Sequence, residues 1–213
     1  MSEISLDRAE QVRNAEEAKK EALSIDNQKF AMWLYLGSEV VIFTVLIATY
    51  VVFRIREPEA VHHVHEALGF TGILLVTFNT FLLLTSSWSM VMGLREIQRD
   101  NIAGLNRWFS ITAVLGAIFV VLQYVEYRRL GDEAVTLDFA SDAFSGFGMH
   151  FYAPTAFHGA HVIVGVLWCL LVMNRARNGR YSSRNYVGVE IFGLYWHFVD
   201  VVWILLFTII YLV

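Results

Sequence analysis

The last stretch of the chain, residues 191–213, decides the fold, and it reads IFGLYWHFVDVVWILLFTIIYLV. It contains one acidic residue, Asp200, and neither lysine nor arginine. Its length matches the roughly 20 residues that an α-helix needs to cross a hydrocarbon core about 30 Å thick. A strand edge in lipid would leave its backbone groups unsatisfied, so the stretch is predicted to be a transmembrane helix.

Four more apolar stretches precede it, and aromatic residues stand near many of their ends, as in the belts at membrane interfaces. The four are residues 30–53, 68–94, 108–127 and 153–173. We therefore expect an all-α polytopic membrane protein, with a bundle of five transmembrane helices over residues 30–213. Residues 1–29 are charged and are predicted to form a solvated tail or a helix that docks on a partner.

Composition supports the membrane assignment and excludes several classes of function. Of the 213 residues, 56% are hydrophobic and 17% are charged, against roughly 25% charged in ordinary soluble domains. The small net charge of -4 predicts no nucleic-acid partner. Cys169 is the single cysteine, which excludes an internal disulfide or a thiolate metal cage, and we interpret it as a small buried hydrophobe.

Lysine and arginine are distributed unequally between the two ends of the predicted helices. If the N-terminus is cytoplasmic, the inner segments hold Arg8, Arg13, Lys19, Lys20, Lys29, Arg95, Arg99, Arg107, Arg175, Arg177, Arg180 and Arg184. The outer segments then hold Arg54, Arg56, Arg128 and Arg129. The positive-inside rule therefore predicts a cytoplasmic N-terminus and a C-terminus outside.

Several ionisable side chains fall within or beside the predicted helices, where each costs at least about 2.5–3.5 kcal/mol without a partner. Their depths follow from the rise of 1.5 Å per residue. We place an outer polar cluster near the exterior, and it consists of Glu126, His158 and His161. An inner polar set lies toward the cytoplasm, and it consists of Glu190, His197 and Asp200.

The outer cluster is interpreted as an interhelical hydrogen-bond network, with Glu126 within reach of His158 or His161. Haem or metal ligation and a proton or lipid-headgroup site are its alternatives. Glu39 lies on the inner side, roughly 14 Å deep, with no cation in its own sequence neighbourhood. We interpret it as either a structural hydrogen-bond donor or a proton-linked buried carboxylate. We assign no catalytic residue and no metal site to this chain.

Motifs on all five expected helices resemble subunit III of the haem–copper respiratory oxidases, the cytochrome c and quinol oxidases. The two most specific are FHGAHVIVG at 157–165 and YWHFVDVVW at 195–203, the latter preceded by Gly188 and Glu190. The others are GSEV at 37–40, NTFLLLTS at 79–86 and LQYVEY at 122–127.

The resemblance implies a short, five-helix bacterial subunit III in the cell inner membrane. Such a subunit carries no haem or copper; subunit I holds them, reduces oxygen and pumps protons. Subunit III sustains proton uptake and the stability of subunit I. By resemblance, Glu39 matches the family's buried carbodiimide-reactive carboxylate, His158 and His161 its H-G-x-H motif, and His197 and Asp200 its W-H-x-x-D motif. The implied partners are subunits I and II and membrane phospholipids, with a respiratory supercomplex left open.

Relative to the seven-helix mitochondrial form, this chain begins at what resembles the third helix, so one wall of the family's lipid cleft is missing. The residues alone leave two other functions open. One is a haem-binding anchor like a b-type cytochrome, with His158 or His161 paired to His197, although their estimated depths differ. The other is a small transporter built on the carboxylates, against which Pro58 and Pro154 lie outside the helix interiors.

Overall fold

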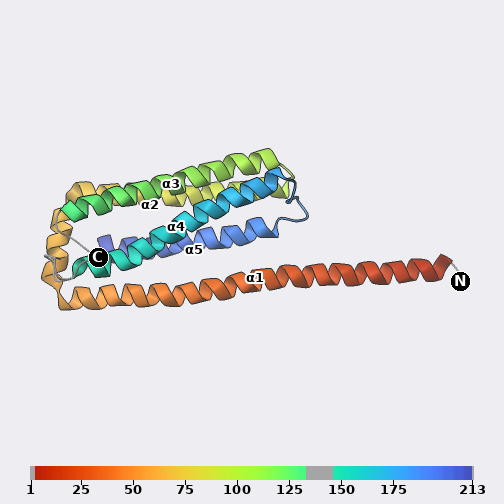
Figure 1. Ribbon diagram of the computed structural model, residues 1–213, viewed down its shortest axis with the longest axis horizontal. Coiled ribbons are helices and arrows are strands. Elements are labelled where there is room, and N and C mark those ends of the chain that lie inside the picture. Colours follow the sequence, from red (N-terminus) through yellow and green to blue (C-terminus); the bar gives the residue numbers. More distant parts are fainter. Residues whose placement is uncertain (1–2, 133–145, 213) are drawn as a thin grey trace.

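The computed structural model describes residues 3–132 and 146–212, and in these ranges the chain is a bundle of long helices (Figure 1). The helices are α1 (Glu3–Arg56), α2 (Pro58–Gln98), α3 (Ile102–Asp132), α4 (Phe147–Arg177) and α5 (Val187–Phe207), and a short π-helix, η1 (Thr208–Leu212), continues α5. Five segments of the described chain are long and apolar enough to cross a membrane: Leu23–Arg56, Gly69–Gln98, Ile102–Asp132, Phe147–Arg177 and Val187–Leu212. The predicted all-α, five-span fold is confirmed.

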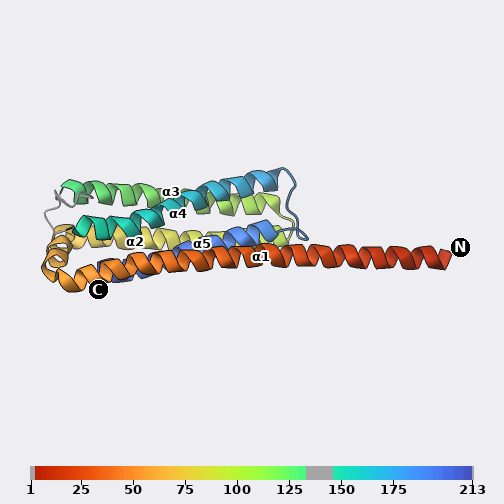
Figure 2. The same ribbon diagram turned by 60° about the horizontal axis from the view of Figure 1, so that its bottom comes forward.

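Four of the helices form a square, and the fifth lies along one of its sides. Around the square, α2 packs on α3, α3 on α4, α4 on α5, and α5 on α2. Helix α1 contacts α4 and α5, so it covers the face between those two helices. Figures 1 and 2 show α1 running beside the bundle and then far beyond it toward the N-terminus.

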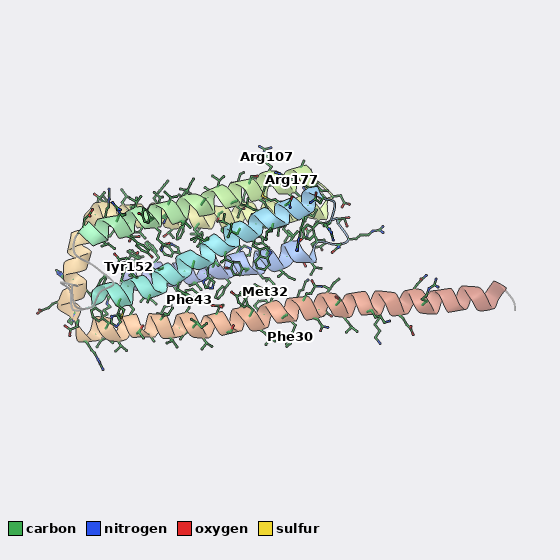
Figure 3. All side chains as sticks on the ribbon, viewed as in Figure 1. Phe30, Met32, Phe43, Arg107, Tyr152 and Arg177 are labelled. Carbon is green, nitrogen blue, oxygen red and sulfur yellow. The ribbon has the colours of Figure 1, made fainter. Side chains whose placement is uncertain are left out.

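The apolar side chains explain this arrangement. On α1, Met32 and Phe43 lie on the side of the bundle and are buried, whereas Phe30 lies on the opposite side and is 62% exposed (Figure 3). Exposed apolar side chains are frequent on all five spans, as expected where lipid is the solvent. Inside the square, the indole of Trp196 lies over Gly116 and Gly165, where an added Cβ would come within 2.8 and 2.6 Å of it. These glycines let α3 and α4 approach α5 closely.

The helices extend beyond the apolar stretches that predicted them. Residues 3–29 continue the first transmembrane helix without a break, although they are charged. Helix α2 begins at Pro58, a favourable first-turn position for proline, and Gly69 breaks its helical conformation with a φ of 56°. Helix α4 begins at Phe147 and contains Pro154, so the predicted start at 153 was six residues late. Apolar stretches mark the part of a helix in lipid, and the helix itself continues into the aqueous layer.

The segments predicted to lie on the inside gather at one end of the bundle. Arg107 near the start of α3 and Arg177 at the end of α4 lie at the end from which α1 projects, and Tyr152 lies at the other (Figure 3). At the first end, the Ser183 backbone N–H and hydroxyl donate to Asp100 Oδ1 at 2.5 Å and Oδ2 at 2.6 Å, which joins the α2–α3 turn to the α4–α5 loop.

Candidate functional site

Glu39 and His161 form an acid–imidazole pair halfway along the membrane spans. Glu39 Oε2 lies 3.3 Å from His161 Nε2, and the two side chains are 11% and 10% exposed. The distance is that of an ion pair, but the ring N–H is not aligned for a hydrogen bond with that oxygen. Glu39 therefore points into the bundle, where His161 of α4 provides the polar partner that its own sequence neighbourhood lacks.

The chemistry of His161 follows from its second ring nitrogen. Nδ1 lies 2.8 Å from the carbonyl oxygen of Phe157, and a carbonyl can only accept, so Nδ1 must carry a hydrogen. Nε2 is then the ring nitrogen that faces the Glu39 carboxyl, at 3.3 Å from Oε2.

Aromatic rings enclose this pair. Phe43 and Phe157 pack edge-on against the His161 ring, with centroids 5.4 and 4.7 Å away. The Tyr195 hydroxyl donates to the backbone oxygen of His161 at 2.8 Å, and Tyr35 stacks on the Tyr195 ring. These contacts fix the imidazole against Glu39 from three helices.

The predicted division into outer and inner polar groups was wrong for His161. We placed it on the outer side, one to two turns into α4, and Glu39 on the inner side, yet they are in contact. Because α4 begins at Phe147, His161 lies fourteen residues, or roughly 21 Å, from the start of its helix. Both residues are therefore near the middle of the bilayer.

The predicted hydrogen bond from Glu126 to His158 or His161 was also wrong. His158 is fully buried and stacks on the Trp203 indole with ring centroids 4.9 Å apart, and neither of its nitrogens has a hydrogen-bond partner among the described residues. Both nitrogens of His161 are already engaged. Glu126 is buried with Tyr211 as its polar neighbour, a partner that its sequence position did not predict. Here α3 turns Glu126 toward the C-terminal end of the chain rather than toward α4.

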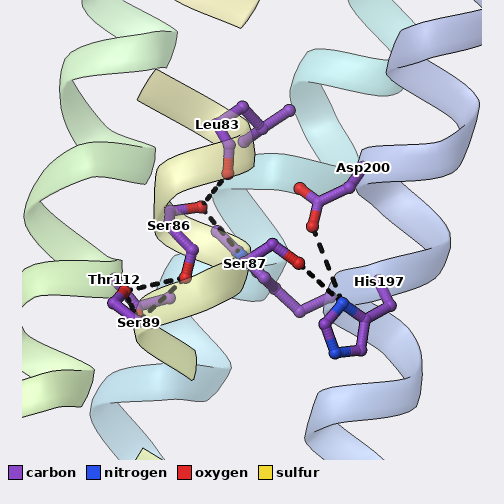
Figure 4. A network of polar contacts seen from close by, with 8 residues as sticks. Leu83, Ser86, Ser87, Ser89, Thr112, His197 and Asp200 are labelled. Atoms are coloured by element: carbon purple, nitrogen blue, oxygen red, sulfur yellow. Dashed lines mark hydrogen bonds and ion pairs between the residues drawn. The ribbon is translucent and has the colours of Figure 1, made fainter. Parts of the chain in front are cut away.

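The inner set divides into two separate contacts. Glu190 forms an ion pair with Lys29 of α1, at 2.8 Å, near the inner ends of the spans. Deeper in α5, His197 Nδ1 lies 2.6 Å from the Ser87 hydroxyl of α2 and 3.9 Å from Asp200 Oδ2 (Figure 4). Serine and aspartate approach the same ring nitrogen, so this group is not the serine–histidine–acid relay of a hydrolase.

The sequence did not predict that Ser87 and Lys29 contact the inner set. It also did not predict the two hydroxyl groups of α2 that accept hydrogen bonds from tryptophans of α5. Trp196 Nε1 donates to Ser86 Oγ at 3.0 Å, and Trp203 Nε1 donates to Thr80 Oγ1 at 2.9 Å. The pairing is antiparallel: Trp203 follows Trp196 by seven residues on α5, and Thr80 precedes Ser86 by six on α2. Over residues 3–132 and 146–212, no three His, Cys, Asp or Glu side chains converge to hold a metal ion.

Comparison of the sequence with known proteins identifies the family of the chain. Residues 13–213 match the family described as cytochrome c oxidase subunit III. The chain belongs to this family. It is 40% identical to a cytochrome c oxidase subunit 3 of Synechocystis over 88% of this chain and 76% of that one. It is 36% identical to that of Thermostichus vulcanus over 88% of each, and 32% identical to a quinol oxidase subunit 3 of Bacillus subtilis over 84% of each.

Membership confirms the resemblance recognised in the sequence motifs. The chain is a subunit III of a haem–copper terminal oxidase, a multi-pass membrane protein that works within a complex of oxidase subunits. Subunits of this family hold no redox centre, so the haem-anchor interpretation of His158, His161 and His197 is set aside. The family also sets aside the transporter interpretation of the carboxylates.

Proposed function

We propose that this chain supports proton uptake and the stability of subunit I in a proton-pumping terminal oxidase of a bacterial inner membrane. Its partners are subunits I and II and membrane phospholipids. Membership of a larger respiratory supercomplex is left open. The N-terminus lies in the cytoplasm and the C-terminus outside. The gathering of Arg107 and Arg177 at the end from which α1 projects supports this orientation under the positive-inside rule.

The observation that carries the proposal is the nearly buried pair of Glu39 and His161, with Oε2 and Nε2 3.3 Å apart. A buried acid facing a buried imidazole can accept or release a proton at fixed geometry, because the surrounding rings hold both side chains in place. A redox subunit that takes up protons during turnover can use such a neighbour as a local reserve. The same pair also ties α1 to α4, which links proton handling to the integrity of the bundle.

The decisive variant is Glu39→Gln, which keeps the shape and hydrogen-bonding capacity of the side chain and removes its proton exchange. We expect the variant complex to assemble with normal subunit content. Its turnover should fall, or its active lifetime should shorten, at high pH, where proton supply limits the reaction. Oxygen consumption is measured against pH, with subunit content checked on the same preparation. Unchanged rate and lifetime across the pH range would leave Glu39 with a structural role alone.

Assembly is tested separately by purifying the complex through this chain. We expect a larger haem-containing polytopic subunit to co-purify, whereas the chain released from the complex should be colourless. A stoichiometric Soret band in the released chain would contradict the proposal, and so would the absence of haem-bearing partners from the purified complex.

A further inference from the structure

His197 is exposed where the membrane offers it no partner. Its side chain is 45% exposed in the isolated chain. It lies ten residues after the start of α5 at Val187, or about 15 Å into the span, and fifteen residues before the end of η1 at Leu212. An imidazole facing hydrocarbon at this depth is costly, and intramembrane ionisable groups generally face protein.

The contacts of His197 hold the ring so that one nitrogen faces inward. Nδ1 bonds Ser87 on α2 at 2.6 Å, and buried Asp200 lies behind it at 3.9 Å (Figure 4). Within residues 3–132 and 146–212, both polar contacts of the ring are made by Nδ1, and Nε2 is the nitrogen that remains for a partner. Both carboxylate oxygens of Asp200 also lack a hydrogen-bond partner within the described ranges.

The position of His197 in the helix square identifies the surface concerned. Ser87 belongs to α2 and His197 to α5, so the ring lies on the α2–α5 face, adjacent to the face that α1 covers. Exposed apolar side chains flank the polar position at helical spacing: Leu84 precedes Ser87 by three residues on α2, and Val201 and Ile204 follow His197 by four and seven residues on α5. A large apolar surface with one oriented polar group at its centre is suited to a packed transmembrane helix with a matching polar side chain.

We infer that the α2–α5 face docks on a transmembrane helix of the haem-bearing oxidase subunit, which places a hydroxyl, amide or carboxylic acid side chain against His197 Nε2. The inference rests on the proposed function, because it takes the partner to be another subunit of the oxidase. On the opposite side of the square, the groove between α3 and α4 is lined only by apolar side chains, those of Ala117, Val120, Val121, Ile163, Val166 and Leu167, so lipid suffices there.

The first test measures how firmly the haem-bearing subunit is retained on the complex purified through this chain. His197→Phe keeps a planar ring and removes both nitrogens, and we expect roughly 3- to 20-fold weaker association, as for loss of one interhelical hydrogen bond of about 0.6–1.7 kcal/mol. His197→Gln should restore much of the retention. Ser87→Ala is the control: it removes the internal bond at Nδ1 but leaves Nε2 for the partner, so retention should stay near the unmodified level.

The second test locates the surface with a photo-reactive amino acid at two matched valines. Val201 on α5 is 56% exposed and Val114 on α3 is 57% exposed, at similar depths in their spans. We expect a cross-link from position 201 to the haem-bearing subunit and none from position 114. Unchanged retention in His197→Phe, or a cross-link from position 114 in place of 201, overturns this inference. If the unmodified chain retains no haem-bearing subunit, the proposed function itself has failed.

Discussion

Glu39 and His161 join a helix outside the four-helix square to a helix within it, with Oε2 and Nε2 3.3 Å apart. Each group is buried and each provides what the other lacks, so neither can be removed without leaving its partner unmatched in an apolar setting. Helix α1 is the span with few internal neighbours, because it contacts mainly α4 and α5. The pair therefore contributes to the attachment of α1, in addition to the proton exchange that we propose for it.

A double-mutant cycle measures this attachment. Glu39→Ala and His161→Ala should each lower the free energy of unfolding by about 1–3 kcal/mol, because each leaves a buried polar group unsatisfied. The double variant should lose less than the sum, with a coupling of about 0.5–3 kcal/mol. Denaturant-induced unfolding in detergent provides the measurement. Ser38→Ala, next to Glu39 but bonded only within α1, is expected to stay within about 0.5 kcal/mol, and additive effects of the two main variants would show that the pair is not coupled.

Close packing around Trp196 predicts a contrast between two glycines. A Cβ at Gly165 would lie 2.6 Å from the Trp196 ring, so Gly165→Ala should destabilise the bundle by about 1–3 kcal/mol through overpacking. Gly37 has nothing within 4 Å of an added Cβ, so Gly37→Ala should be neutral or stabilising by up to about 1 kcal/mol through helix propensity. Thermal unfolding of the two variants in one detergent tests the contrast, and equal destabilisation would contradict it.

The ion pair between Lys29 and Glu190 should be weak and sensitive to salt. Its side chains are 40% and 26% exposed, and partly exposed pairs typically contribute about 0.2–1 kcal/mol. Lys29→Glu places two acidic groups together and should loosen α1 from α5, and adding Glu190→Lys should restore the contact. The measurement is the melting temperature of the single and double variants in low and high salt. A destabilisation that the second change does not rescue would trace the effect to Lys29 alone.

Asp100 predicts an acid sensitivity of the inner loops. The Ser183 hydroxyl, followed by its backbone N–H, donates to this carboxylate and holds the pKa of Asp100 below its ordinary value of 3.8. A lowered pKa in the folded state means that the contact stabilises the loop above pH 3.8 and is lost as pH falls through the folded value. Asp100 also has a φ of 58°, which aspartate tolerates better than most residues.

Hydrogen exchange of the Ser183 amide, corrected for its intrinsic rate, measures this loss. Protection should decrease as pH falls below 3.8 in the unmodified chain. In Ser183→Ala the decrease should be smaller and should end at a higher pH, because the hydroxyl bond that lowers the pKa of Asp100 is gone. Asp100→Asn does not titrate, so its protection should not change over this range. The same pH profile in Asp100→Asn and in the unmodified chain would assign the effect to another group.

The sequence predicts which segments cross the membrane because apolar composition over some 20 residues is a local property. Motifs such as GSEV at 37–40 also led correctly to the family. The predicted depth of His161 was wrong, because the apolar stretch from which it was counted begins six residues after the helix does. Helix α4 starts earlier, with polar and aromatic residues and with Pro154 in its third turn, a position where proline is normally avoided.

Which side chains of neighbouring helices contact each other could not be predicted from the sequence, for a different reason. Glu126 could be assigned a depth, but depth does not give the direction in which a helix turns its side chain. Rotation of each helix is set by packing, here by Trp196 over its two glycines and by Trp203 against Thr80 and His158. The residues found in contact with the predicted set, such as Ser87 and Tyr211, are of types common throughout such bundles, so nothing in isolation distinguishes them.

The unbroken length of α1 has a mechanical consequence. Its 54 residues span roughly 80 Å, so the projecting part and the Glu39 position belong to one rod with a fixed angular phase. A one-residue insertion between Lys20 and Asp26 would turn everything before it by about 100° relative to Glu39. A seven-residue insertion would restore the phase to within about 20° while lengthening the rod. Whatever meets the aqueous end of α1 is thereby held in register with an acid in the middle of the bilayer.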